Sequence, residues 1–280
     1  MKGTLFIVAT PIGNLEDITL RAIRVLREAG LVAAEDTRRT AKLFQAHGIR
    51  TPLTSLHDWN EREKSAAIME KLLAGMNVAC VSDAGTPGIS DPGYVLVKTA
   101  IEKGIPVVPV PGPSAIITAV SVSGLPMDRF VFFGFLPSRA SQRRKFLASL
   151  ADEEKTMIFH ESPRRLREAL EDLGELLGDR EIVIARELTK LHEEILRGTV
   201  SEVRDRLKDT PPRGEITLLV AGRPKQSAPP EPGDALRDRI LELAGEGGAS
   251  VRDLVSRLTE ETGLPRSLVY REALQVLKKK

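Results

Sequence analysis

Short apolar runs alternate with longer polar-apolar segments over the first 110 residues of the chain. The longer segments carry Ile, Leu and Val at helical spacing. We therefore expect strands at Leu5–Ala9, Leu31–Ala34, Val78–Val81 and Ile105–Val110, and helices at Asp17–Ala29, Thr37–His47, Glu61–Ala74 and Gly93–Lys103. Strands and helices in alternation predict an α/β domain over residues 1–112 with a mostly parallel sheet.

A second α/β pattern follows the turn at residues 111–113. We expect a helix near Arg164–Leu177 and hairpin-like pairing of Glu194–Thr199 with Arg213–Val220. The remaining apolar runs are Ile116–Val122, Phe130–Phe135, Met157–His160, Ile182–Ala185 and Ile216–Ala221. Together they predict a second α/β domain over residues 113–222.

A proline-rich segment separates this part of the chain from its C-terminal end. Residues 222–233 hold four prolines and two glycines, which is typical of a linker, and we place the linker at 223–233. Beyond it, Ser250 is suited to cap a helix, and the segment at 262–265 forms a turn. Short helices joined by a Gly-containing turn predict a helical, helix-turn-helix-like domain over residues 234–280.

Composition narrows the class of protein. Of the 280 residues, 41% are hydrophobic and 29% are charged, with a net charge of only +2, so any RNA binding must come from local patches. Cys80 is the single cysteine, which excludes an internal disulfide and favours a reducing, cytoplasmic location. No apolar run approaches the roughly 20 residues that span a bilayer. No cluster of His, Cys and acids has metal-ligand spacing, so we expect no metal.

The most informative positions are the turns that follow the first four apolar runs. Three are rich in Gly and Pro, at Thr10–Asn14, Ser82–Gly93 and Pro111–Ala115, and one is acidic, at Glu35–Thr40. Each alone is compatible with an ordinary turn into a helix, and acids in a first helical turn match the helix dipole. If the strands are parallel, all four turns meet at one sheet edge, which is where α/β sheets bind ligands.

These segments resemble the tetrapyrrole methylase superfamily. The residues that carry the resemblance are Leu5–Thr19, Ala34–Arg38, Ser82–Gly93 and Pro111–Ala115, and the similarity runs over residues 3–222. It implies the two-domain α/β fold of the class III methyltransferases, a homodimer, and S-adenosylmethionine as methyl donor. The motifs and the C-terminal helical domain are most similar to the branch that methylates the 2′-oxygen of a cytidine in the decoding region of 16S rRNA. The implied partner is therefore 16S rRNA or the 30S subunit.

The resemblance also assigns residues to the donor site, motif by motif. The first loop has fewer glycines than the superfamily's usual Gly-x-Gly-Pro-Gly, and Ser82-Asp83-Ala84 stands where Gly-Asp-Pro is usual, with the acid retained. The residues that would line the donor site are Pro11, Ile12, Gly13, Asp83, Ala84, Gly85, Ser114 and Ala115.

Catalytic candidates follow from the chemistry of methyl transfer to a ribose. A neutral hydroxyl is a poor nucleophile, so it needs a base or a cation that stabilises the developing anion. Glu187 is a candidate base, and Lys190 or Arg186 is a candidate for holding phosphate or oxyanion; Glu35 is a rival base from the first domain. The alternative is that the 186–190 segment is a solvated strand end.

The densest basic region predicts the RNA contacts. The expected RNA-binding residues are Arg38, Arg139, Arg143, Arg144, Lys145 and Arg186. Ordinary charged helix faces would give the same pattern. Aromatic residues make up only 4% of the chain, so we do not expect base stacking on an aromatic platform to dominate.

Two other functions fit parts of the sequence. One is a methylase of a small tetrapyrrole or corrinoid precursor, but such a substrate needs neither the linker nor the helical tail. The other is a nucleic-acid-binding regulator with a ligand-sensing body, but a tail with about as many acids as bases is poorly suited to it.

Overall fold

A computed structural model describes residues 1–57, 59–208, 213–224, 234–245 and 250–277. The chain divides into two compact units, residues 1–223 and 224–280. The first unit carries both predicted α/β patterns, each with its own sheet. The boundary between those two patterns at residue 112 stays a prediction.

The first sheet has five parallel strands in the order β3-β2-β4-β1-β5. The strands are β1 (Leu5–Val8), β2 (Leu31–Ala34), β3 (Leu53–Ser55), β4 (Val78–Val81) and β5 (Val107–Val110). Four match the expected apolar runs. The short strand β3 was not predicted, because three residues of mixed polarity give no periodic signal.

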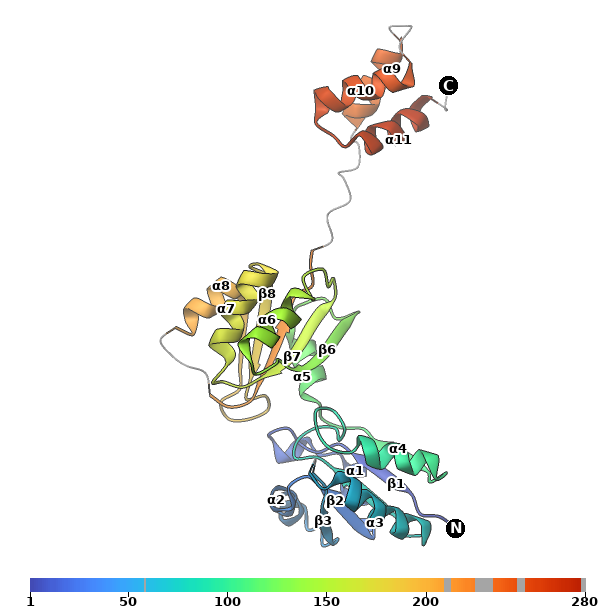
Figure 1. Ribbon diagram of the computed structural model, residues 1–280, viewed down its shortest axis with the longest axis vertical. Helices are drawn as coiled ribbons and strands as arrows, with labels where there is room; N and C mark the ends of the chain where they lie inside the picture. Colours follow the sequence, from blue (N-terminus) through green and yellow to red (C-terminus); the bar gives the residue numbers. More distant parts are fainter. Residues whose placement is uncertain (58, 209–212, 225–233, 246–249, 278–280) are drawn as a thin grey trace. The chain divides into compact units, whose positions relative to one another are not determined.

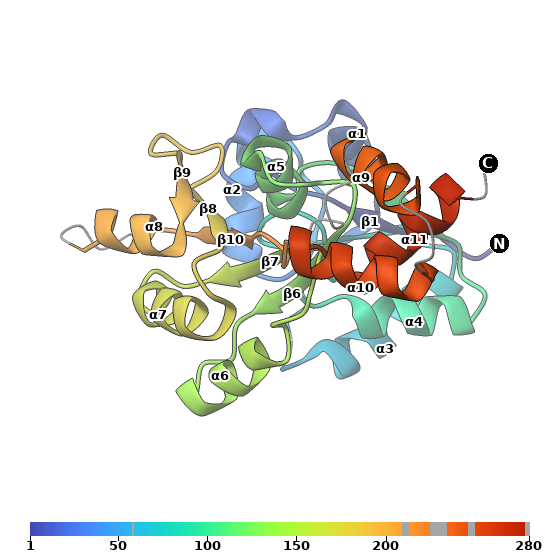
Figure 2. The same ribbon diagram turned by 90° about the horizontal axis from the view of Figure 1, so that it is seen from above.

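Helices cover both faces of this sheet, as in doubly wound folds. The helices are α1 (Leu20–Glu28), α2 (Thr37–His47), α3 (Glu61–Leu73) and α4 (Tyr94–Glu102), with a 3₁₀ turn, η1, at Leu15–Asp17. Buried residues of α1 and α2 pack on one face, and those of α3 and α4 pack on the other. Helices α3 and α4 lie side by side (Figure 1 and Figure 2). All four expected helices are present. Because they cover the two faces of the sheet, the loops at the strand ends can form a site.

The second sheet also has five strands, in the order β6-β7-β10-β8-β9. They are β6 (Phe130–Phe135), β7 (Thr156–Glu161), β8 (Glu181–Arg186), β9 (Glu194–Thr199) and β10 (Ile216–Val220). β6 and β7 are parallel, and the other neighbours are antiparallel. The expected pairing of β9 with β10 is wrong: β10 inserts between β7 and β8, and β9 pairs with β8. All five β10 residues are buried, so the centre of the sheet suits this strand.

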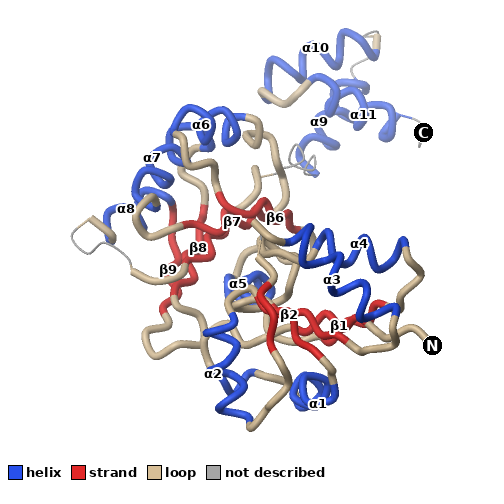
Figure 3. The backbone as a smooth tube through the Cα atoms, turned by 60° about the horizontal axis from the view of Figure 1, so that its bottom comes forward, coloured by secondary structure: helices blue, strands red, loops and turns tan. Residues whose placement is uncertain are grey.

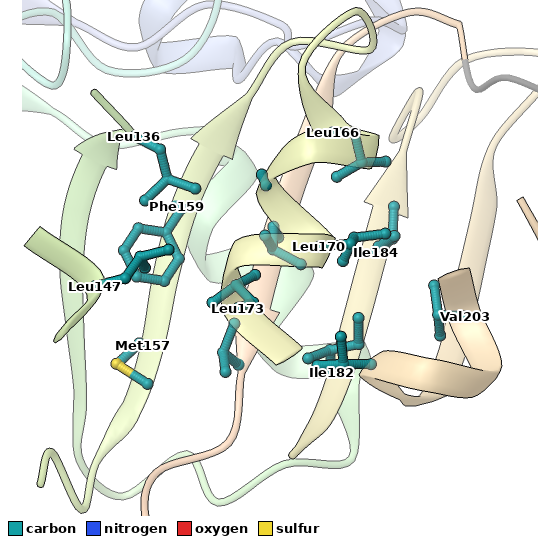
Figure 4. Packing of buried hydrophobic residues seen from close by; sticks show 14 of the residues in the cluster. Leu136, Leu147, Met157, Phe159, Leu166, Leu170, Leu173, Ile182, Ile184 and Val203 are labelled. Atoms are coloured by element: carbon teal, nitrogen blue, oxygen red, sulfur yellow. The ribbon is translucent and has the colours of Figure 1, made fainter. Parts of the chain in front are cut away.

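Helices again cover both faces of the second sheet. They are α5 (Ala115–Ser123), α6 (Ala140–Ala148), α7 (Leu166–Leu177) and α8 (Val200–Arg206). The apolar run at 116–122 is therefore a helix, and its buried residues pack on one sheet face with the cluster that includes Ile158 and Leu219. Helices α6, α7 and α8 lie along the opposite face (Figure 3). Figure 4 shows how Phe159, Leu170 and Ile184 pack there.

The second unit is a small helical body with its own core. It contains α9 (Asp234–Gly245), α10 (Val251–Thr262) and α11 (Arg266–Leu277), whose apolar faces bury one cluster. Ser250 caps α10 by accepting a hydrogen bond from the Asp253 N–H, which confirms the predicted cap. Within the parts of the chain that the structure describes, no helix is long and apolar enough to cross a membrane.

Candidate functional site

The turns after β1, β2, β4 and β5 meet at one edge of the first sheet and enclose a cavity of about 410 Å³. Its opposite wall comes from the second sheet, at the ends of β6, β7 and β8 and the start of β10. Six of the eight residues predicted for the donor line it: Ile12, Asp83, Ala84, Gly85, Ser114 and Ala115. Pro11 and Gly13 are not among the lining residues. The convergence predicted from four parallel strands is therefore confirmed.

Backbone hydrogen bonds join the first loop, which follows β1, to the third loop, which follows β4. The Thr10 N–H donates to the Gly85 carbonyl (2.9 Å), and the Gly85 N–H donates to the Thr10 carbonyl (3.0 Å). Gly85 has φ +79°, where a side chain would strain the backbone. The glycine thus allows a tight turn that fixes two cavity-lining loops against each other.

Two acidic side chains, Glu35 and Asp83, join the second loop, which follows β2, to the third loop by reciprocal hydrogen bonds. The Asp83 N–H donates to Glu35 Oε2 (3.2 Å), and the Asp36 N–H donates to Asp83 Oδ1 (2.9 Å). Arg39 Nη1 lies 3.4 Å from Asp83 Oδ2. Glu35, Arg39 and Asp83 all line the cavity, so this edge presents two carboxylates and one guanidinium to a ligand.

Arg38 lies beside this network and is bound to Asp36. Its Nε and Nη2 donate to the two carboxylate oxygens of Asp36, at 3.0 and 2.7 Å. The Arg38 side-chain hydrogen bonds, followed by its backbone N–H, hold the pKa of Asp36 well below its usual range. The Arg38 side chain is 88% exposed, so it can still approach an anion.

The first loop also contacts the predicted catalytic segment of the second α/β pattern. The Asn14 N–H donates to Thr189 Oγ1 (3.0 Å). A Cβ on Gly13 would lie 2.5 Å from Lys190 Cγ and 2.8 Å from the Leu188 carbonyl oxygen, so only glycine fits there. The close approach explains Gly13 without any ligand contact, and it brings the segment 187–190 to the edge of the cavity.

Glu187 and Lys190 form an ion pair in that segment. Lys190 Nζ lies 2.8 Å from Glu187 Oε1 and 3.2 Å from Glu215 Oε2. The hydrogen bond from Lys190 and the one from the Glu215 N–H lower the pKa of Glu187. Burial alone would lower the pKa of Lys190, but its two carboxylate partners raise it. Both groups are therefore charged at neutral pH.

The backbone of this segment is strained. Among the residues that the structure describes, the non-glycine positions with positive φ are Ser90 (64°), Glu187 (51°) and Thr189 (65°). Such conformations are uncommon for residues other than glycine, and they concentrate at functional sites. Ser90 lines the cavity, and Glu187 and Thr189 flank Leu188, which also lines it.

Several cavity residues were missed by the sequence reasoning. They are Phe135, His160, Glu161 and Glu215, among others, whereas Arg39, Ile89 and Ser90 belong to turns that were expected at this edge. Burial lowers the pKa of His160, against the opposing charge of Glu215. The signal that could have found His160 and Glu161 is a pair of titratable residues at the end of an apolar run. Among the described residues, no group of His, Cys, Asp and Glu is arranged to hold a metal ion.

One predicted RNA contact needs correction. The Arg143 side chain is only 2% exposed, and its Nε donates to Asp172 Oδ2 (2.7 Å), so it is a buried structural cation and cannot reach a phosphate. Arg144 is half-buried and paired with Asp172 and Glu175. Arg139 and Lys145 are exposed.

Arg186 does not belong to the group of basic residues at α6. It lies at the end of β8, its side chain is 22% exposed, and its Nη2 lies 2.8 Å from Glu194 Oε2. An anion would have to compete with that carboxylate.

Comparison with known proteins gives three concordant results. The family model described as "Tetrapyrrole (Corrin/Porphyrin) Methylases" matches residues 4–204. Proteins named ribosomal RNA small subunit methyltransferase I are similar over nearly the whole chain. The one from Pseudomonas aeruginosa is 48% identical over 277 residues, covering 98% of this chain and 97% of the relative. The one from Synechocystis sp. is 46% identical over 276 residues, covering 98% of each chain.

Solved structures show the same fold at low sequence identity. The methyltransferase CobJ aligns with a TM-score of 0.61 and 20% identity, covering 79% of this chain and 94% of that one. Uroporphyrin-III C-methyltransferase from Thermus thermophilus, complexed with S-adenyl homocysteine, aligns with a TM-score of 0.56 and 20% identity, covering 78% of this chain and 97% of that one.

Proposed function

The chain belongs to the tetrapyrrole methylase family and, within it, to the ribosomal RNA small subunit methyltransferase I proteins; from this we propose that it transfers a methyl group from S-adenosylmethionine to 16S rRNA. The finer proposal is that the acceptor is the ribose 2′-oxygen of a cytidine in the decoding region. The observation that carries the proposal is the cavity at the carboxyl edge of the parallel sheet, closed by loops of a second sheet. The solved structures of CobJ and the uroporphyrin-III C-methyltransferase share the fold alone, so they do not favour a tetrapyrrole substrate.

The cavity residues fit the proposed donor. Its first-sheet wall combines small side chains at 84–85 and 114–115 with the Asp83 carboxylate, which is 20% exposed. Small residues leave room for a nucleoside, and a carboxylate accepts hydrogen bonds from hydroxyls or an ammonium group. When bound, S-adenosylmethionine supplies an electrophilic methyl group on a positively charged sulfur. We assign Ile12, Asp83, Ala84, Gly85, Ser114 and Ala115 to donor binding, with Pro11 and Gly13 shaping the loop.

Lys190 is our choice for the group that stabilises charge on the acceptor oxygen. Its raised pKa keeps it protonated, as a cation facing a developing oxyanion must be. Glu187 has a lowered pKa and accepts hydrogen bonds from Lys190 Nζ and the Glu215 N–H, so it is a weak base and orients Lys190 instead. Glu35, on the cavity wall, is our candidate for the proton acceptor.

Exposed cations are the proposed RNA contacts. They are Arg38, Arg139 and Lys145, with Arg144 and Arg186 as further cations that are already paired with carboxylates. Arg143 is left out because it is buried. A homodimer and a cytoplasmic location complete the proposal; sedimentation velocity of the purified chain tests the first.

Identification of the labelled product tests the function directly. The chain is incubated with methyl-labelled S-adenosylmethionine and, in separate reactions, with 30S subunits, naked 16S rRNA and a tetrapyrrole mixture. We expect label on RNA, at a cytidine whose 3′ phosphodiester resists alkaline cleavage because the 2′-oxygen is methylated. Label on a base contradicts the 2′-oxygen assignment, and label on no RNA contradicts the proposed function.

Variants of the ion pair test the catalytic assignment. We expect Lys190→Ala to lower kcat about 10²-fold, a typical loss for one transition-state donor, with donor affinity unchanged. Glu187→Gln should lower kcat less, since it keeps an oxygen for the Glu215 N–H. If Lys190→Ala and Glu187→Ala both retain full turnover and donor binding, the segment is not catalytic.

A further inference from the structure

An exposed phenylalanine lines the cavity in a chain that is poor in aromatic residues. Phe135, the last residue of β6, is 56% exposed although it carries a large apolar ring. Ile89, on the loop after β4, is another cavity residue that leaves an apolar side chain 45% exposed. Burial of such side chains is normally favourable, so two of them exposed in one cavity indicate a surface that a ligand covers.

The local backbone directs Phe135 to this position. The pairing of β6 with β7 shifts between Phe132, which is opposite Ile158, and Phe135, which is opposite His160. Three steps along β6 thus match two along β7, which is a β-bulge, and Gly134 at the bulge has φ +72°. Bulges redirect side chains next to active sites.

The ring of His160, which also lines the cavity, contacts Phe135. The His160 ring lies 5.5 Å from the Phe135 ring, centroid to centroid, at an interplanar angle of 52°. It also contacts Phe132 at 5.0 Å in an edge arrangement. His160 is therefore held between two phenylalanines, and this row fixes the wall on which Phe135 lies.

The opposite wall of this part of the cavity comes from the loop after β4. A Cβ on Gly134 would lie 3.8 Å from Ser90 Oγ, so the bulge of β6 lies against that loop. Ser90 holds a strained backbone with φ 64°, next to Ile89. The rim thus has apolar side chains on two facing segments, a geometry suited to a flat ring.

The proposed donor residues come from the loops after β1, β4 and β5. Ile12, Ala84 and Ala115 pack in one cluster with Ala185 and Leu188 of the β8 end, and with Phe130 and Phe132 of β6. Strand β6 is an edge strand, and two strands separate it from β8. Phe135 is not part of that cluster, and its neighbour Gly134 lies against Ser90, five residues beyond the proposed donor residues 83–85 of the same loop.

We propose that Phe135 is the stacking platform for the base of the acceptor nucleotide, turned out of its RNA strand into the cavity, with His160 as the residue that positions the ring. This inference rests on the proposed function. Sequence-specific RNA recognition targets unpaired bases that are splayed out and stacked on aromatic side chains, and enzymes that act on a base extrude it in the same way. Because Phe135 and the proposed donor residues line the same cavity, a pyrimidine stacked on the ring would keep its ribose in the cavity that holds the donor.

Substitution at Phe135 tests the proposal with the full chain and the RNA form that the wild type methylates. Stacking of one base predicts that Phe135→Ala lowers kcat/KM for RNA about 5- to 150-fold. Donor affinity, measured by calorimetry, should stay within twofold of wild type. Phe135→Tyr keeps the ring and should retain most of the wild-type kcat/KM. Phe135→Leu keeps an apolar side chain without a ring and should retain only part of it. Trp59→Ala is the matched control, because Trp59 is 95% exposed and does not line the cavity.

An abasic substrate distinguishes stacking from a general effect on the wall. The RNA carries a ribose without a base at the nucleotide mapped for the wild type. On this RNA the ratio of wild-type to Phe135→Ala kcat/KM should fall to near one, since no base is left to stack. An equal ratio on both RNAs overturns the proposal, as does a Phe135→Ala variant with unchanged kcat/KM. A loss of donor affinity instead assigns the ring to the donor's adenine. Failure of the wild type to label RNA is a separate result, which contradicts the proposed function itself.

Discussion

Asp172→Asn tests the buried ion pairs that hold Arg143 inside the protein, where it cannot contact RNA. The Asp172 carboxylate, 10% exposed, accepts hydrogen bonds from Arg143 Nε and Arg144 Nη1, both at 2.7 Å. Removing one partner of a buried ion pair costs about 3–5 kcal/mol. Arg143 keeps Glu168 at 3.2 Å, and asparagine keeps one acceptor oxygen, so we expect the lower end, about 3 kcal/mol.

Calorimetry of the full chain measures this loss. For a unit of 223 residues, about 3 kcal/mol lowers the melting temperature by roughly 6–12 °C. The control is Glu175→Gln, which removes an exposed partner of Arg144 and should cost at most about 1 kcal/mol. Equal losses in the two variants would refute the reasoning that Arg143 depends on a buried partner.

The difference in stability between wild type and Asp172→Asn depends on pH, and the pKa of Asp172 sets the sign of that dependence. Burial raises the pKa of Asp172, but the hydrogen bonds from Arg143 and Arg144 outweigh it and hold the pKa below its usual value. The pair thus contributes its full stability above the unfolded pKa, about 3.9, and loses it as the pH falls through the lower folded value. The difference in melting temperature between wild type and Asp172→Asn should therefore become smaller at acid pH.

Two other predictions concern the site. Gly13→Ala places a methyl group 2.8 Å from the Leu188 carbonyl oxygen, so we expect donor affinity to fall at least about tenfold by calorimetry; unchanged affinity would show that the loop can move without cost. Arg139→Ala and Lys145→Ala should each reduce the slope of log K for RNA against log salt by about 1, since both are exposed, whereas Arg143→Met should leave the slope unchanged while destabilising the fold. A reduced slope for Arg143→Met would restore that residue to the RNA surface.

The sequence was most informative where local pattern and topology coincide. Parallel strands force their following loops to one edge, so Asp83 and Ser114 could be placed in one site without any contact information. The position of β10 could not be predicted, because an antiparallel strand from the end of the chain can pair with several neighbours and its hydrophobic pattern selects none of them. Arg143 and Arg144 are adjacent basic residues, but only the packing of α6 on α7 buries one beside Asp172 and leaves the other half-exposed.

The exposed ring of Phe135 shows what the low aromatic content of the chain can and cannot predict about stacking. A content of 4% aromatic residues argues against a broad platform for many bases, but a single acceptor nucleotide needs only one exposed ring in the right place. The sequence Phe132-Phe133-Gly134-Phe135 gives no sign of which ring is exposed, since strict alternation would place Phe133 and Phe135 on the same face. The bulge at Gly134 breaks that alternation: Phe133 packs against Phe146 and Phe159 in the core, and Phe135 turns to the cavity. One glycine with positive φ thus allows a core-forming strand to present an exposed ring to the cavity as well.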